Sequence, residues 1–361
     1  MLRGFISYGF DLSGTQLISR NSEKRNKLIQ IFSSILIVKF LLAILAFSLI
    51  CFLVLFIEKF HAHWEIFLLT SLLMFSDVIF PIWFFQGMEK MKLITYLRIS
   101  YKGSFVIAIL LLVHQKNDIW LVPLLDSLGA MLAGIIAIII VKKNFNVYFK
   151  KQKYIYILFQ LKYGWHIFLS KISVILYTSL NTFVLGILTN NESVGYYSLA
   201  EKVYMAIRGL YSPFIQALFP YLSKKFIKDK NLYFTLVKRI SIGFFLSLII
   251  VSFLVYGYSD KIIYLISGKQ TIPSIEILQI LSLAIIFSIG SLYSIFLIIK
   301  GEGKKLSKIT FISMLLNTIL IYPFIYLFNI YGLAYVFVTV QILQAILQFY
   351  HNKEIFFQGK I

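Results

Sequence analysis

Nine charged residues interrupt stretches of this chain that are otherwise apolar, and their types define the chemistry to consider. They are Lys39, Asp77, Arg98, Lys102, Asp126, Lys171, Glu201, Lys202 and Arg208. An arginine can hold two phosphate oxygens at once, whereas a lysine acts as a point charge. A cluster of such cations suits a pyrophosphate. We therefore expect a cationic binding cavity lined by Lys39, Arg98, Lys102, Lys171 and Arg208.

The depth of each base within its apolar stretch leaves a second interpretation open. Lys39, Arg98 and Lys171 lie about 7–10 Å from the nearer basic end at 1.5 Å per helical residue. A side chain at that depth can extend its charge to the water interface, which explains these bases as well as a cavity does. Lys102 and Arg208 are deeper, at roughly 14–20 Å. Because Arg98 and Lys102 are four residues apart, they share one helix face, and we favour a cavity there.

The three acids suggest ion coupling. Asp77, Asp126 and Glu201 lie inside apolar stretches, where carboxylates are costly and often carry protons or cations in transport. Glu201 could also simply pair with a basic neighbour.

Neutral polar residues could complete the cavity. Ser170, Tyr177 and Asn181 share one helix face and could line a wet space. Hydrogen bonding between helices explains them equally well. His61 and His63 have no further ligands nearby, so we expect no metal site. No nucleotide-binding glycine loop is evident, and we expect no cofactor.

The elements that must position these residues are membrane helices. The chain is 59% hydrophobic and 14% charged, too apolar for a soluble protein of 361 residues. Ten apolar runs are long enough to cross about 30 Å of hydrocarbon. They cover 33–57, 64–86, 93–113, 119–141, 166–188, 194–221, 240–258, 276–299, 306–328 and 330–350. We interpret residues 1–18 as part of a further span. The predicted fold class is an all-α, polytopic membrane protein.

Loop charges predict the orientation. One alternating set of loops carries 24 basic residues and the other carries four. Because cytoplasmic loops are enriched in lysine and arginine, the basic set and the C-terminus are expected in the cytoplasm. This asymmetry also explains the net charge of +20 without a nucleic-acid partner.

The long basic and aromatic connection at 142–165 divides the chain into lobes. We interpret it as a cytoplasmic interfacial linker between an N-lobe at 1–141 and a C-lobe at 166–361. An ordinary long loop is the alternative. A weak repeat relates residues 2–7 to 207–212, which supports two lobes and implies that the N-lobe lacks its first helix. Pro81, Pro213 and Pro220 could act as hinges, or could be ordinary membrane-helix prolines.

Four stretches carry a resemblance to a known family. They cover 8–13 (YGFDLS), 80–91 (FPIWFFQGMEKM), 181–186 followed by 194–202, and 216–221. In order and spacing they resemble the Wzx-type polysaccharide repeat-unit flippases, which transport O-antigen precursors. The WFFQGME run is the most specific of them. The family usually has a further helix before the YGF motif, so the chain resembles a truncated member.

The resemblance implies a MATE-like fold of two helical bundles in the bacterial inner membrane. It implies a transporter that flips an undecaprenyl-pyrophosphate-linked oligosaccharide to the periplasmic leaflet by alternating access, for O-antigen and lipopolysaccharide synthesis. Membrane lipid, and the polymerase and chain-length proteins of the same pathway, are the implied partners.

Three other functions remain open. A multidrug or cation exporter of the same superfamily would need an acidic cavity, whereas bases outnumber acids within these spans. A membrane polymerase or ligase would need sizeable outer loops with a nucleophile and base, which we do not find in the sequence. A structural membrane protein would not need buried bases.

Overall fold

The computed structural model of the protein describes residues 2–56 and 64–357, most of which are helical. No strand occurs among these residues, which agrees with the predicted all-α class. His61 and His63 lie outside the described residues. The chain divides into two compact units, Met1–Phe168 and Leu169–Ile361.

Eight helical segments are long and apolar enough to cross a membrane. They are Arg25–Phe56, Trp64–Gly87, Met91–Leu112, Asp118–Phe145, Lys230–Gly257, Ile272–Ile299, Gly303–Phe328 and Ile330–Asn352. Helices α9 (Tyr154–Leu188) and α10 (Asn191–Lys228) correspond to the other two predicted spans and extend beyond them at one or both ends. The chain is therefore a polytopic membrane protein, and the count of ten spans stays a prediction for α9 and α10.

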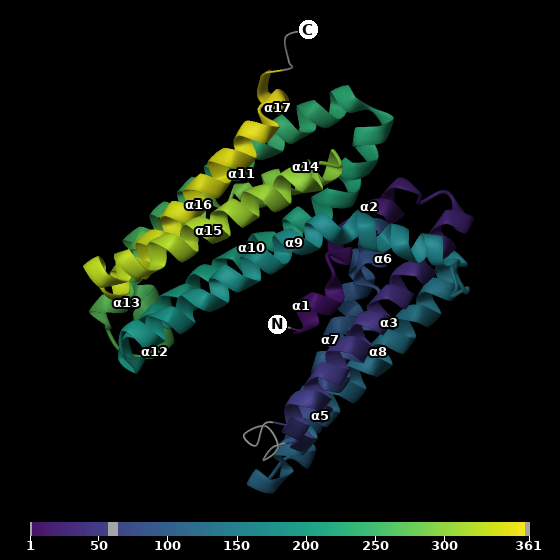
Figure 1. Cartoon of the computed structure of the whole chain (residues 1–361), viewed down its shortest axis with the longest axis horizontal. Coiled ribbons are helices and arrows are strands. Elements are labelled where there is room, and N and C mark those ends of the chain that lie inside the picture. The colour runs from purple at the N-terminus through teal and green to yellow at the C-terminus, as the bar shows by residue number, and fades with distance from the viewer. Residues whose placement is uncertain (1, 57–63, 358–361) are drawn as a thin grey trace. The chain divides into compact units, whose positions relative to one another are not determined.

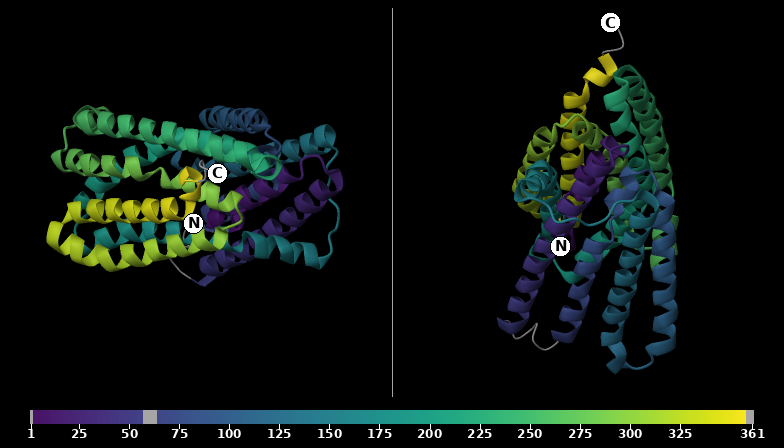
Figure 2. Two further views of the ribbon diagram at one scale, coloured as in Figure 1. Left: turned by 90° about the horizontal axis from the view of Figure 1, so that it is seen from above. Right: turned by 90° about the vertical axis from the view of Figure 1, so that its right-hand side faces the viewer.

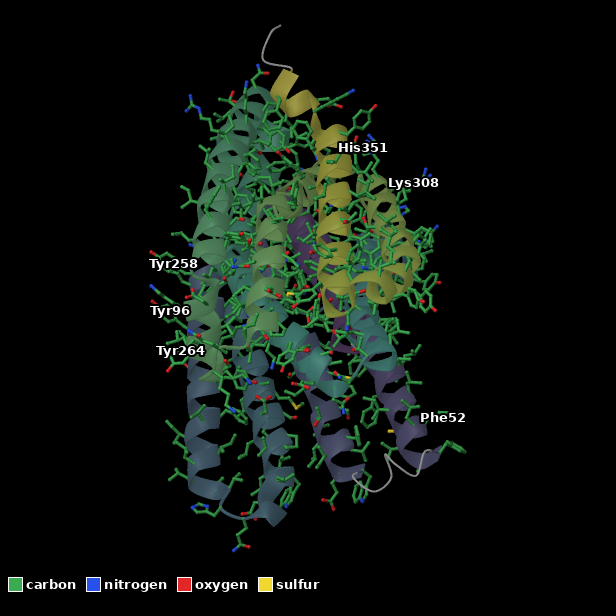
Figure 3. The ribbon with its side chains drawn as sticks, turned by 90° about the vertical axis from the view of Figure 1, so that its left-hand side faces the viewer. Phe52, Tyr96, Tyr258, Tyr264, Lys308 and His351 are labelled. Carbon is green, nitrogen blue, oxygen red and sulfur yellow. The ribbon has the colours of Figure 1, made fainter. Side chains whose placement is uncertain are left out.

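Apolar side chains cover the outside of these helices. Helix α7 (Met91–Leu112) buries only Ile94 among its described residues, and Leu110 is 72% exposed. Phe52 on α3 (Arg25–Phe56) and Tyr96 on α7 point outward in Figure 3. Exposed apolar surface of this extent is unfavourable in water and suits contact with lipid.

Unit 1 is a bundle built around α5 (Trp64–Ile79). Helix α5 packs against both α3 and α8 (Leu121–Phe145), and α7 packs against α8. The long helices of this unit, purple to blue in Figures 1 and 2, run side by side. The short helices α1 (Leu2–Ser7), α2 (Phe10–Arg20) and α6 (Ile82–Gly87), the 3₁₀ turn η1 (Lys116–Trp120) and the start of α9, up to Phe168, also belong to the unit.

Pro81 explains an interruption in the predicted 64–86 span. Helix α5 ends at Ile79 and α6 begins at Ile82. Proline has no N–H to donate and disfavours helical geometry in the residue before it, here Phe80. A break thus falls at Pro81, one of the predicted hinge positions. Helix α10 continues through Pro213 and Pro220 without an interruption.

Unit 2 is built around α13 (Ile272–Phe287). Helix α13 contacts α10, α11 (Lys230–Gly257) and α16 (Ile330–Asn352), while α14 (Gly290–Ile299) and α15 (Gly303–Phe328) pack against α16. The short helices are α12 (Ser259–Ser267) and α17 (Glu354–Phe357). Lys308 and His351 lie toward one end of this unit, and Tyr264 lies toward the other (Figure 3).

The connection between α8 and α9 is shorter than the predicted linker. Residues 146–153 are not helical, and α9 begins at Tyr154. Residues 142–165 therefore include the last turn of α8 and the first three turns of α9. Their role as an interfacial linker stays a prediction.

Candidate functional site

Within unit 2, Arg208 lies among tyrosines contributed by two helices. Tyr204, Arg208 and Tyr211 occupy one face of α10, because their spacing of four and three residues matches the helical repeat. The Arg208 guanidinium acts electrostatically on the hydroxyls of Tyr204, Tyr211 and Tyr177, the last of which comes from α9. The Tyr204 hydroxyl lies 3.3 Å from the hydroxyl of Ser288. We call Tyr177, Tyr204, Arg208, Tyr211 and Ser288 the Arg208 cluster.

The Arg208 cluster is buried but keeps hydrogen-bonding capacity. Tyr204 is 1% exposed and Tyr177 is 2% exposed, whereas Arg208 is half-buried. The Tyr211 hydroxyl is also buried, and it lies close enough to Ser288 and Arg208 to be influenced by both. The Asn181 amide oxygen, four residues after Tyr177 on α9, is buried and has no hydrogen-bond partner among the described residues. Buried polar groups normally need a partner, and an amide oxygen accepts hydrogen bonds, so Asn181 could accept one from a sugar hydroxyl.

Sequence reasoning named Tyr177, Asn181 and Arg208 but missed Tyr204, Tyr211 and Ser288. The signal for the tyrosines is a stripe along α10 with helical spacing, which places them on the face of Arg208 and Glu201. Ser288 could not be found in this way, because it lies at the interruption between α13 and α14 and is 84 residues from Tyr204.

In unit 1, Lys102 and Asp126 form an ion pair. The Lys102 ammonium on α7 lies 2.7 Å from Oδ1 of Asp126 on α8. The Tyr101 hydroxyl donates a hydrogen bond to the same oxygen. The Lys102 side chain is 54% exposed and that of Asp126 is 20% exposed. The structure thus brings a predicted phosphate ligand to a predicted ion-coupling acid, and Arg98 lies exposed one turn earlier on α7.

Lys39 is held inside unit 1. It is 5% exposed, and its ammonium donates a hydrogen bond to the main-chain carbonyl of Asp77 on α5. In this structure its charge therefore does not extend to the water interface, which was the alternative explanation for Lys39. A buried ammonium needs such partners because hydrocarbon cannot solvate it.

The remaining predicted residues lie on α9 and α10. Ser170 is buried, and Lys171 and Glu201 are half-buried. The Glu201 carboxylate acts electrostatically on the buried hydroxyl of Tyr197. Arg98 and Lys102 belong to unit 1, whereas Lys171 and Arg208 belong to unit 2, so one cavity shared by all four stays a prediction.

The most specific sequence motif packs helices together. Trp83, Phe84 and Phe85 on α6 are fully buried. On α2, the Thr15 hydroxyl lies 3.2 Å from the Trp83 carbonyl oxygen and 3.2 Å from the Gln86 side-chain oxygen. The motif therefore fixes α6 against α2.

Comparisons with known proteins give a consistent family and fold. A family model described as polysaccharide biosynthesis protein matches residues 1–226. A protein of Shigella dysenteriae that carries the name of an O-antigen transporter is 28% identical over 92% of this chain and 84% of its own. One of Escherichia coli (strain K12) with the same name is 28% identical over 97% of this chain and 86% of its own. A crystal structure of a MATE protein in the bent conformation matches 97% of this chain and 84% of its own, with a TM-score of 0.82 and 14% identity. This last likeness establishes the MATE-like fold alone.

Proposed function

The chain belongs to the polysaccharide biosynthesis protein family, and from this premise we propose that it is a flippase for a lipid-linked oligosaccharide. The substrate is an undecaprenyl-pyrophosphate-linked repeat unit, moved from the cytoplasmic to the periplasmic leaflet for O-antigen synthesis. The observation that carries the proposal is the pair of relatives named as O-antigen transporters, each matched over more than 80% of both chains.

The Arg208 cluster supports an anionic substrate. A guanidinium can bind a pyrophosphate oxygen pair, and the surrounding tyrosine hydroxyls can donate further hydrogen bonds. Burial strengthens these interactions because the local dielectric constant is low. The sugar part needs hydrogen-bonding groups, which Asn181 and Tyr177 can supply, while the lipid tail can remain in the bilayer.

Alternating access fits the two-unit organisation. In the proposed cycle one unit moves against the other, so that the substrate site faces each side of the membrane in turn. Each unit contains an interrupted helix, α5–α6 in unit 1 and α13–α14 in unit 2. Such interruptions are positions where a helix can bend without losing regular hydrogen bonds elsewhere.

The Lys102–Asp126 pair suggests how transport is coupled to an ion. Lys102 can bind a phosphate more strongly once it leaves Asp126, since the two anions compete for one positive charge. Protonation of Asp126 would weaken the pair and release Lys102. Asp126 is therefore our preferred coupling acid.

A multidrug or cation exporter is the weaker alternative. The MATE structure shares the fold, but a cationic drug would be repelled by the Arg208 guanidinium. A polymerase or ligase of the same pathway is also disfavoured, because the relatives that match most of the chain are named as transporters.

Complementation of a flippase-deficient strain tests the proposal. We expect the protein to restore surface O-antigen when the matching repeat unit is synthesised. Accumulation of lipid-linked repeat units at the cytoplasmic leaflet, despite normal abundance of the protein, would contradict it.

A further inference from the structure

A pocket at the end of unit 1 lies apart from the charged residues considered so far. It has a volume of about 510 Å³ and is lined by Ile138, Lys142, Tyr148 and Phe149. Its size falls within the range of small-molecule sites. The lining combines one cation with an aliphatic and two aromatic side chains, a mixture that suits a ligand with a charged and an apolar part.

Hydrogen bonds to α3 hold the loop that forms one wall of this pocket. The Lys150 amide donates to the Ser33 hydroxyl at 3.0 Å, and the Arg25 guanidinium donates to the Asn146 carbonyl oxygen at 2.9 Å. Val147, in the same loop, is buried, with 1% of its surface exposed. Because the loop is fixed in this way, Tyr148 and Phe149 are held outward, at 43% and 57% exposure.

The surroundings of the pocket suit the interface of a membrane leaflet that carries anionic lipids. Lys143, Lys150, Lys151 and Lys153 lie within eleven residues of Lys142 and add positive charge. The first residue of α9, Tyr154, is 74% exposed. Aromatic rings favour the headgroup level, and clustered lysines beside a membrane helix attract anionic lipids.

We propose that this pocket binds the headgroup of an anionic glycerophospholipid. Lys142 holds the lipid phosphate, while Ile138, Tyr148 and Phe149 contact the glycerol and the first part of the acyl chains. Charge complementarity selects this occupant, because the single lining charge is positive. The bound lipid would fix the α8–α9 connection at the membrane surface.

Native mass spectrometry of the whole protein tests the proposal, with phosphatidylglycerol titrated against phosphatidylcholine. We expect preferential binding of phosphatidylglycerol, and we expect Lys142→Gln to weaken it about fivefold, since one lysine near an anionic surface contributes about 1 kcal/mol. Lys142→Arg should retain binding. Lys143→Gln is the matched control, because this adjacent lysine does not line the pocket.

Thermal unfolding in the presence of each ligand identifies the source of the phosphate. Phosphatidylglycerol should raise the Tm of the wild-type protein and raise it less in Lys142→Gln, whose Tm without lipid should be unchanged. Equal weakening by Lys142→Gln and Lys143→Gln would overturn the proposal in favour of diffuse attraction. Equal protection by inorganic phosphate, or tighter binding of undecaprenyl phosphate than of phosphatidylglycerol, would also overturn it.

Discussion

Both the charge and the planar shape of the Arg208 guanidinium could contribute to binding of an anionic substrate. The hydroxyls of Tyr177, Tyr204 and Tyr211, from α9 and α10, lie near enough to interact with the guanidinium electrostatically. A lysine at this position would keep the charge but lose the planar donor pair. Substitutions at Arg208 therefore separate a general need for positive charge from a specific need for paired hydrogen bonds.

We expect Arg208→Ala to abolish complementation of a flippase-deficient strain and Arg208→Lys to reduce it. A lost charge-assisted hydrogen bond costs about 1.5–3 kcal/mol, which corresponds to a transport rate lowered by roughly tenfold or more. Lys202→Gln is the control, because this lysine is on the same helix but exposed. Normal transport by Arg208→Ala at unchanged abundance would leave Arg208 with a structural role at most.

The Lys102–Asp126 ion pair leads to a second prediction, which concerns reversal of its charges. Lys102→Asp places two acids in contact and should lower protein abundance, and the double variant Lys102→Asp/Asp126→Lys should restore it. A double-mutant cycle on thermal unfolding should give a coupling energy of about 0.5–3 kcal/mol. Tyr101→Phe is the control, since it removes one hydrogen bond and keeps both charges. Additive effects of the two single substitutions would show that the ion pair does not contribute.

The charged positions could be found from the sequence, but their pairing could not. A lysine or aspartate within an apolar run stands out at once, because hydrocarbon does not solvate it. Which group each base meets depends on how separate helices pack. Lys39 bonds the main-chain carbonyl of Asp77, 38 residues away, and Lys102 pairs with Asp126, 24 residues away. No helical repeat relates either separation.

Among the elements, α6 is held against α2 by glycines that permit close approach. A Cβ atom on Gly87 would lie 2.6 Å from the Ile18 side chain and 2.9 Å from the Thr15 carbonyl oxygen. A Cβ atom on Gly14 would lie 3.2 Å from the Trp83 ring. This contact explains the glycine in the WFFQG motif, since any side chain there would separate the two helices.

We therefore expect Gly87→Ala to destabilise the protein by about 1–3 kcal/mol, the usual cost of overpacking. Gly103→Ala is the matched control, because a Cβ atom on Gly103 would meet nothing within 4 Å. That change should be neutral or slightly stabilising, as alanine favours a helix more than glycine does. The measurement is thermal unfolding in detergent. Similar Tm values for the two variants would contradict the proposed packing role.

The sequence predicts where the long helices lie more accurately than the residues at which they begin and end. Hydropathy marks the part of a helix that lies in hydrocarbon, whereas helical hydrogen bonding continues into the polar flanks. For this reason α3 begins at Arg25, although the predicted apolar run begins at 33, and α10 continues to Lys228. Unlike the break at Pro81, the helix interruption at Ser288 contains no proline that could have indicated it in the sequence.

For the whole molecule, loop charge predicts the orientation in the membrane. The basic connections, with 24 basic residues against four in the alternate set, should remain in the cytoplasm because lysine-rich loops are not readily translocated. The basic loops occur in both units. Loop charge therefore predicts the orientation of the whole chain in the membrane, which the packing within each unit does not. The lipid pocket at Lys142 and the C-terminus would then face the cytoplasm.

Reporter fusions test this topology directly. A fusion after Lys151 or Lys225 should be active with a cytoplasmic reporter and inactive with a periplasmic one, and a fusion at Asn190 should show the reverse. The Asn190 position lies between α9 and α10, so it also tests whether both helices cross the membrane. Cytoplasmic signals at all three positions would mean that α9 and α10 do not span. A periplasmic signal at Lys225 would reverse the assignment of unit 2, and with it the side from which an anionic substrate could reach Arg208.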